Sequence, residues 1–209
     1  MFGIWKRKKQ KVAGDIALLG LQEWWFDTFT EEEREWMAAT YAPLGARARP
    51  LVEGAPYVPR PHPFGYLSNA AVWFNKEGYR HCAYAFIDKA YEASTTDLNP
   101  LDVHFAYMNH CKVFYRWRKE DDEALDRAVM ACERGIEIQA AAAGAWEQAY
   151  GDALPRHYCF WQLAVIEEKR GNFLRAIELC DAAQAGGWNG DWLSRRERLE
   201  RKRAKLGAH

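Results

Sequence analysis

The 209-residue sequence has no run of 18 apolar residues, which is the length that a membrane-spanning helix needs. Its N-terminus also lacks the small-residue cleavage site of a secretory signal. Charge of one sign is not in excess, because 29 lysine and arginine residues balance 29 aspartate and glutamate residues. A uniformly basic nucleic-acid-binding surface is therefore not indicated. We expect a cytoplasmic protein.

Cysteine spacings typical of disulfide frameworks or zinc knuckles are also absent. The number of cysteines is odd and no C-x-x-C motif occurs. Cys82, Cys111, Cys132, Cys159 and Cys180 each fall in a segment with a helical pattern. A free cysteine in such a segment behaves as a small buried apolar residue, which fits a reducing compartment.

Catalytic motifs are missing as well. The sequence contains no H-E-x-x-H, no glycine-rich phosphate loop and no G-x-S-x-G. His81-Cys82 and His110-Cys111 are sequence neighbours, so we expect their side chains on different helix faces. We therefore predict no enzymatic activity, no metal site and no cofactor.

The charges are unevenly distributed along the chain. Residues 1–12 carry five cations, residues 194–209 carry seven cations and two acids, and the part between them has a net charge of −10. Such ends favour an alternative function, in which the chain contacts nucleic-acid phosphates or an anionic membrane. Simple solvation of the charged ends would give the same pattern.

Aromatic residues, in contrast, are abundant: 10 Trp, 10 Tyr and 10 Phe exclude disorder over most of the length. After a basic flexible tail over residues 1–14, we predict a helical arm over residues 15–42, in which Thr30 and Glu33 form a capping box. Five rings of the arm require burial, so the arm is expected to dock on its own chain or, alternatively, on a second copy: Trp24, Trp25, Phe26, Phe29 and Trp36.

Prolines are concentrated in one segment. Six of the eight lie in residues 43–63, a density that excludes a regular helix. We predict an extended connector over residues 43–64, partly of polyproline II type. Its apolar members Leu51, Val52, Tyr57 and Val58 are expected to pack on the rest of the protein.

The remaining sequence has helical periodicity and no strand pattern. We expect helix pairs at residues 66–77 and 80–94, 101–118 and 121–143, and 156–170 and 173–186, followed by a charged helix that ends near Leu206. Glycine and alanine recur at fixed spacing, at Gly78, Ala83 and Ala90 and again at Gly171, Ala176 and Ala183. The second pair keeps only Ala124 and Ala131. Small residues at these positions permit close packing of helices.

With Leu163-Ala164, Gly171-Asn172-Phe173 and Ala176-Ile177, the third pair resembles a tetratricopeptide repeat. The whole chain also resembles an uncharacterised bacterial group with tetratricopeptide-like folds, which implies no activity. The resemblance implies an all-α, right-handed array of about three antiparallel helix pairs in residues 65–209, closed by a C-terminal capping helix. It departs from the repeat at Ala71 and Lys112, where glycine is usual.

The resemblance also implies a concave groove lined by the first helix of each pair, and hence a non-enzymatic protein–protein interaction module. A groove of this composition suits an extended peptide, because amides pair with a peptide backbone and cations hold a carboxylate. We expect the partner to be a protein or peptide, with a second copy of the chain as the alternative. The candidate groove residues are Asn69, Asn75, Lys76, Asn109, His110, Arg116, Trp117, Tyr158, Trp161, Gln162 and Lys169.

Overall fold

The computed structural model describes residues 12–46, 48–54 and 62–206. Over these residues the chain forms eleven α-helices and no strand, with one isolated bridge between Arg156 and Asn189. The predicted all-α class is confirmed. None of the described helices has the length and apolar character needed to cross a bilayer. The chain divides into two compact units, Met1–Ala93 and Ser94–His209, and each is described by itself.

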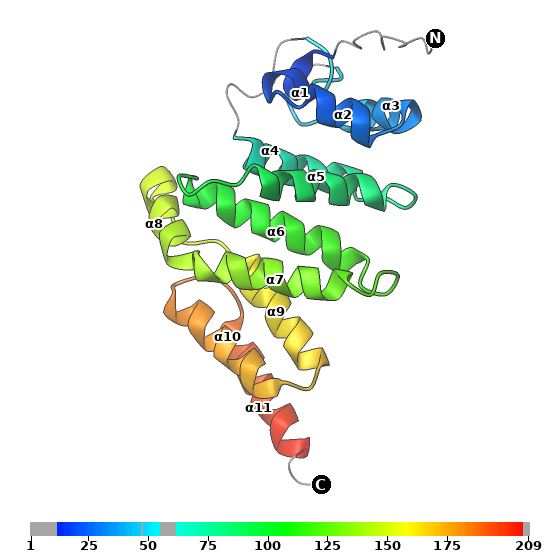
Figure 1. Ribbon diagram of the computed structural model, residues 1–209. Coiled ribbons are helices and arrows are strands. Elements are labelled where there is room, and N and C mark those ends of the chain that lie inside the picture. Colours follow the sequence, from blue (N-terminus) through cyan, green and yellow to red (C-terminus); the bar gives the residue numbers. More distant parts are fainter. Residues whose placement is uncertain (1–11, 47, 55–61, 207–209) are drawn as a thin grey trace, which may run out of the picture. The chain divides into compact units, whose positions relative to one another are not determined.

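Unit 1 contains five helices, coloured blue to green in Figure 1. Their bounds are α1 Gly14–Leu18, α2 Gln22–Thr28, α3 Glu31–Thr40, α4 Pro63–Phe74 and α5 Arg80–Glu92. Helix α4 packs along α5, and α3 contacts α4. The predicted first helix pair is therefore present, with its first helix beginning at Pro63.

The predicted capping box starts α3. The Thr30 hydroxyl accepts a hydrogen bond from the Glu33 amide at 3.3 Å, and the Glu33 carboxylate accepts one from the Thr30 amide at 2.8 Å. Two amide groups that have no partner within the helix are thereby satisfied. The same pair of bonds fixes the Glu33 side chain at the start of α3.

The aromatic arm docks on α5 within unit 1. The ring centroids of Trp24 and Phe86 are 5.1 Å apart, and those of Phe29 and Phe86 are 5.8 Å apart. Trp25 lies in the same cluster and is almost completely buried. Burial of such rings removes a large apolar area from water. The predicted intramolecular docking of the arm is confirmed.

The described part of the proline-rich connector departs from the extended conformation predicted for residues 43–64. Residues 48–54 form consecutive turns rather than polyproline II, with the amides of Val52 and Glu53 both donating to the Arg49 carbonyl. Arg49 has a φ of 54°, a left-handed value that is uncommon for a residue with a side chain. Leu51 is fully buried, as expected. Tyr57 and Val58 lie outside the described residues.

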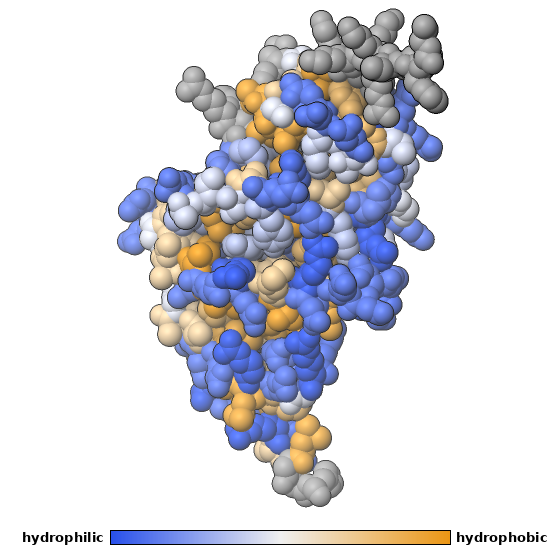
Figure 2. All heavy atoms as spheres, viewed as in Figure 1, coloured by the Kyte–Doolittle hydropathy of each residue, from blue (hydrophilic) through white to orange (hydrophobic). Residues whose placement is uncertain are grey.

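Unit 2 contains six helices: α6 Pro100–Arg116, α7 Ala124–Glu137, α8 Gln139–Tyr150, α9 Tyr158–Lys169, α10 Phe173–Ala185 and α11 Trp192–Leu206. Helix α6 packs on α7, α9 on α10, and α10 on α11, while α7 also packs on α9 (Figure 1). On the face of unit 2 seen in Figure 2, hydrophilic residues predominate and apolar residues form separate small patches.

One predicted helix of unit 2 is wrong. The segment 121–143 is not continuous, because α7 ends at Glu137 and a separate helix α8 begins at Gln139. Helix α7 approaches α9 closely: a Cβ atom added at Gly135 would lie 2.8 Å from the Cys159 sulfur. Only glycine permits this approach without displacing Cys159.

The predicted packing role of small residues is borne out. Ala164, Ala176 and Ala183 are fully buried between the helices of unit 2. Gly171, between α9 and α10, has a φ of +80°, which a residue with a side chain rarely adopts. All five cysteines are free and buried, as predicted.

Candidate functional site

Helices α6 and α9 of unit 2 place lysine and tyrosine side chains next to one another. The Lys112 Nζ atom lies 5.0 Å from the centre of the Tyr158 ring. On the same side, the Lys169 Nζ atom donates a hydrogen bond to the Tyr115 hydroxyl at 3.0 Å. Together with Trp161, whose ring centroid lies 5.9 Å from that of Tyr158, these residues form what we call the cation–aromatic face.

Two arginines extend the positive charge of this face. The Arg195 guanidinium of α11 lies 5.6 Å from the Trp161 ring centre, and that of Arg118 lies 4.1 Å from the Tyr115 ring centre. Cations are attracted to the negative faces of aromatic rings. Within the described chain, Lys112 and Lys169 have no carboxylate at ion-pair distance. Their charges are therefore available to an anionic ligand.

Gln162 lies beneath the face and is 2% exposed. Its Oε1 atom accepts a hydrogen bond from the Tyr158 hydroxyl at 3.2 Å. Its Nε2 atom is buried and has no hydrogen-bond partner. A buried donor left unpaired costs about 1–3 kcal/mol, and because this atom is enclosed, a ligand on the surface of the face does not reach it. Burial, together with the nearby thiols and Tyr115, raises the pKa of Tyr158, which keeps the hydroxyl protonated as a donor.

The structure separates the predicted groove residues into distinct environments. Tyr158, Trp161 and Lys169 belong to the cation–aromatic face, and Gln162 lies below it. Sequence analysis missed Lys112 and Tyr115 because the groove positions were taken from the repeat pattern, which placed neither residue in the groove.

Other predicted positions do not join this face. Asn75, Asn109 and His110 are buried rather than open to a groove, and His110 is fully enclosed. Arg116 is exposed and lies over the Trp117 ring at 5.3 Å. Asn69 and Lys76 are exposed on unit 1. A single groove containing all eleven residues is therefore not present within either unit.

A buried histidine cluster occupies another part of unit 2. The rings of His104 and Trp188 are stacked, 7° from parallel, and the His157 ring centroid lies 4.6 Å from that of His104. Burial lowers the pKa of His104 to about 4 and, with the adjacent His104, that of His157 to about 3. Both rings are neutral near pH 7, so this cluster adds no positive charge.

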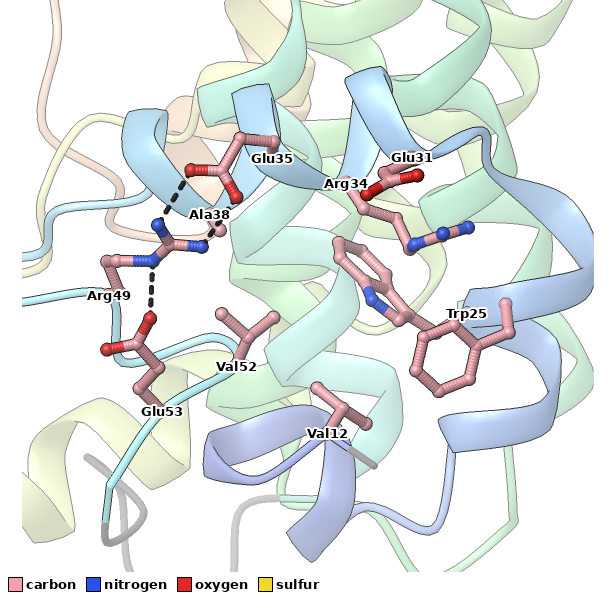
Figure 3. A pocket seen from close by; sticks show the side chains of 10 residues that line it. Val12, Trp25, Glu31, Arg34, Glu35, Ala38, Arg49, Val52 and Glu53 are labelled. Atoms are coloured by element: carbon pink, nitrogen blue, oxygen red, sulfur yellow. Dashed lines mark hydrogen bonds and ion pairs between the residues drawn. The ribbon is translucent and has the colours of Figure 1, made fainter. Parts of the chain in front are cut away.

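Unit 1 has an open pocket of about 370 Å³, shown in Figure 3. The Arg49 guanidinium donates to both carboxylate oxygens of Glu35, at 2.7 and 2.8 Å, and its Nε atom lies 2.7 Å from a Glu53 oxygen. These bonds lower the pKa of Glu35, while burial opposes the shift. Arg49, Glu35 and Glu53 pair with one another, so a charged ligand would gain little by binding beside them. It is lined by Val12, Trp25, Phe26, Glu31, Arg34, Glu35, Ala38, Arg49, Val52 and Glu53.

Several cations of the basic C-terminal helix form ion pairs with acids of unit 2. Arg198 donates two hydrogen bonds to the Glu168 carboxylate, at 2.7 and 2.8 Å, and Lys202 donates a third at 2.6 Å. These contacts lower the pKa of Glu168. Arg196 lies 3.1 Å from an Asp181 oxygen. Cations engaged in this way are less available to phosphates than the sequence indicated.

A last group of polar side chains lies in unit 1. His81 was expected to point away from its neighbour Cys82, but its Nε2 atom lies 3.4 Å from the Cys82 sulfur. The same nitrogen is 2.5 Å from the Oε1 atom of Glu33. The two residues nevertheless differ in exposure, as expected for different helix faces, because His81 is exposed and Cys82 is fully buried.

Comparisons of this chain with models of protein families, with curated proteins and with solved structures gave no match.

Proposed function

We propose that this chain is a protein–protein interaction module built as a tetratricopeptide-like, right-handed array of antiparallel helix pairs. The helices of three consecutive pairs pack on each other, α4 on α5 in unit 1 and α6 on α7 and α9 on α10 in unit 2, as that arrangement requires. The buried small residues Ala164, Ala176 and Ala183 support it further, because they lie where the repeat brings helices close together.

The proposed ligand is an acidic peptide segment bound on the cation–aromatic face. The observation that carries this proposal is the pair of lysines, Lys112 and Lys169, set beside Tyr158 and Tyr115 without a carboxylate partner in the described chain. Carboxylates form charge-assisted hydrogen bonds with such groups. The tyrosine and tryptophan rings would cover apolar parts of the peptide.

The proposal assigns binding rather than catalysis to this face. Its titratable groups are lysines and tyrosines, and burial raises the pKa of Tyr158. A protonated phenol is a poor nucleophile and a poor base at neutral pH. The ion pairs of α11 argue against the alternative of phosphate binding through that helix, since Arg198 and Lys202 are already held by Glu168.

Fluorescence anisotropy with the full chain tests the proposal. The probes are labelled hexapeptides that contain aspartate, glutamate and leucine, and isosteric peptides in which asparagine and glutamine replace the acids. We expect the acidic peptides to bind at least 10-fold more tightly, a difference of about 1.4 kcal/mol. Lys112→Ala and Lys169→Ala should each remove most of this preference.

Lys205→Ala is the matched control, because Lys205 is an exposed lysine of α11 outside the face. It should leave peptide affinity unchanged. Equal affinity for acidic and amide peptides would contradict the proposal, as would unchanged binding by both lysine variants. If Lys205→Ala alone weakened binding, the C-terminal helix would be the binding surface instead.

A further inference from the structure

Three metal-ligating side chains meet in unit 1, away from the proposed peptide site. Glu33 comes from the first turn of α3, and His81 and Cys82 come from the first turn of α5. One carboxylate oxygen, the imidazole nitrogen and the sulfur all lie within 4.8 Å of one another. In the part of the chain that the structure describes, no other three such side chains approach as closely. We propose that Glu33, His81 and Cys82 bind a Zn²⁺ ion.

The arrangement of donor atoms distinguishes a metal site from a proton relay. A cysteine–histidine–acid relay uses both ring nitrogens, one toward the thiol and one toward the acid. Here a single atom, His81 Nε2, faces both the Glu33 oxygen at 2.5 Å and the Cys82 sulfur at 3.4 Å. The three ligand atoms therefore converge on one position. A cation at that point would contact all three.

The separation of the nitrogen and sulfur atoms is close to that in a tetrahedral zinc site. Zinc–nitrogen and zinc–sulfur bonds of about 2.1 and 2.3 Å place the two ligand atoms roughly 3.6 Å apart. The His81 nitrogen and the Cys82 sulfur are 3.4 Å apart. The Glu33 oxygen and His81 nitrogen would separate by about 0.8 Å on binding, relative to a tetrahedral pair. His81 is exposed, so its ring has room for this movement.

The surroundings of the ligands favour a cation. The second Glu33 oxygen accepts the Thr30 amide at 2.8 Å, which orients the carboxylate as outer partners do in metal sites. The start of α3 stabilises the anionic form of the Glu33 carboxylate, whereas burial raises the pKa of the Cys82 thiol, so metal binding has to displace its proton. A thiolate, a carboxylate and a neutral imidazole together balance the two charges of Zn²⁺. The exposed side at His81 leaves a fourth position for water.

An ordinary ion pair between His81 and Glu33, with Cys82 as a core residue, is the competing explanation. It requires no metal and predicts no spectroscopic change on metal addition. Buried Cys180 of unit 2 is a useful comparison, because it is also a free cysteine but lies outside this cluster.

Titration of the reduced, metal-free full chain with Co²⁺ tests the proposal. We expect a thiolate-to-cobalt charge-transfer band in the near ultraviolet that saturates at one equivalent and disappears when Zn²⁺ is added. Cys82→Ser and His81→Gln should abolish the band, whereas Cys180→Ser should preserve it. His81 is exposed, so its variant is expected to remain folded, and far-ultraviolet circular dichroism checks each variant.

Glu33→Gln isolates the carboxylate ligand. Glutamine retains the capping box but lacks the negative charge, so the helix should keep its start while metal affinity falls at least 10-fold. Glu32→Gln, on the same turn of α3, is the matched control and should bind Co²⁺ like the parent chain. Absence of the band in the parent chain, or its persistence in Cys82→Ser, would overturn the proposal. Loss of the band in Cys180→Ser would overturn it as well.

Discussion

The indole of Trp36 lies flat on the phenol ring of Tyr79, with ring centroids 3.5 Å apart and planes 2° from parallel. Trp36 belongs to α3, and Tyr79 immediately precedes α5. Trp36 also contacts Phe74 at the end of α4, with ring centroids 6.1 Å apart. The Trp36 side chain therefore joins the arm to the turn between α4 and α5 of unit 1.

Deletion of residues 1–42 should cause aggregation or a large loss of stability. It removes the rings that cover Phe86 and Phe74, both fully buried in the intact chain. A newly exposed apolar patch of this kind promotes association. Size-exclusion chromatography and thermal unfolding measure both effects. A truncated chain that stays monomeric and equally heat-resistant would show that the docked arm contributes little to stability.

Tyr66→Phe should lower the free energy of unfolding by about 1–3 kcal/mol. The Tyr66 hydroxyl donates a hydrogen bond to the buried Asp15 carboxylate at 2.8 Å, and phenylalanine keeps the ring but removes this donor. Urea unfolding gives the difference. Tyr150→Phe, at an exposed tyrosine, is the control and should change little. Equal stability of the two variants would mean that the buried bond is not stabilising.

Ala176→Trp should destabilise unit 2 by about 3 kcal/mol, the upper end of the usual cost of overpacking, because an indole cannot fit where the methyl group is fully buried. Ala182→Trp, on the exposed side of the same helix α10, should have a small effect. Thermal unfolding followed by circular dichroism compares the two. Similar midpoints would show that α10 is not closely packed at Ala176.

Unit 2 should lose stability as the pH falls below about 6.5. Burial lowers the pKa of His104 to about 4 and that of His110 to about 3, and His157 behaves like His110. The unfolded chain then binds protons that the folded chain excludes, so the free energy of unfolding is greatest above pH 6.5 and declines toward pH 4. Below pH 6.5, each of these histidines lowers the free energy of unfolding by up to about 1.4 kcal/mol for every pH unit.

His104→Phe separates titration from packing. Phenylalanine keeps an aromatic ring beside Trp188 but cannot be protonated. The free energy of unfolding should therefore change less steeply with pH, by about the contribution of one histidine. Urea unfolding between pH 4.5 and 7.5 (roughly the range set by the reference pKa) measures the slope. An unchanged slope would mean that His104 is protonated in the folded chain.

Local signals in the sequence predicted much of the fold. The capping box depends on two residues three positions apart, and the turn at Gly171 depends on one backbone conformation, so both could be predicted without tertiary information. Helix α8 could not, because no glycine or proline marks the break at Ile138. Its separation from α7 is determined by packing rather than by a local breaker.

The candidate sites were harder to predict than the helices. Tyr158, Trp161 and Lys169 were predicted from the phase of the repeat, whereas that phase did not place in the groove the partners that complete the face, which lie on α6. The meeting of Glu33 with His81 depends on how α3 docks beside α5, a contact across 48 positions of sequence. Buried His110 was assigned to a surface because the repeat pattern alone does not determine which polar residues neighbouring helices enclose.

The five buried thiols provide the chain with built-in reporters of local opening. Cys82 belongs to unit 1, and the other four belong to unit 2. A modifying reagent reaches a buried sulfur only when the surrounding helices open, so its reaction rate follows the population of the open state when closing is fast. Without introduced labels, mass spectrometry of alkylated peptides would therefore distinguish opening of unit 1 from opening of unit 2.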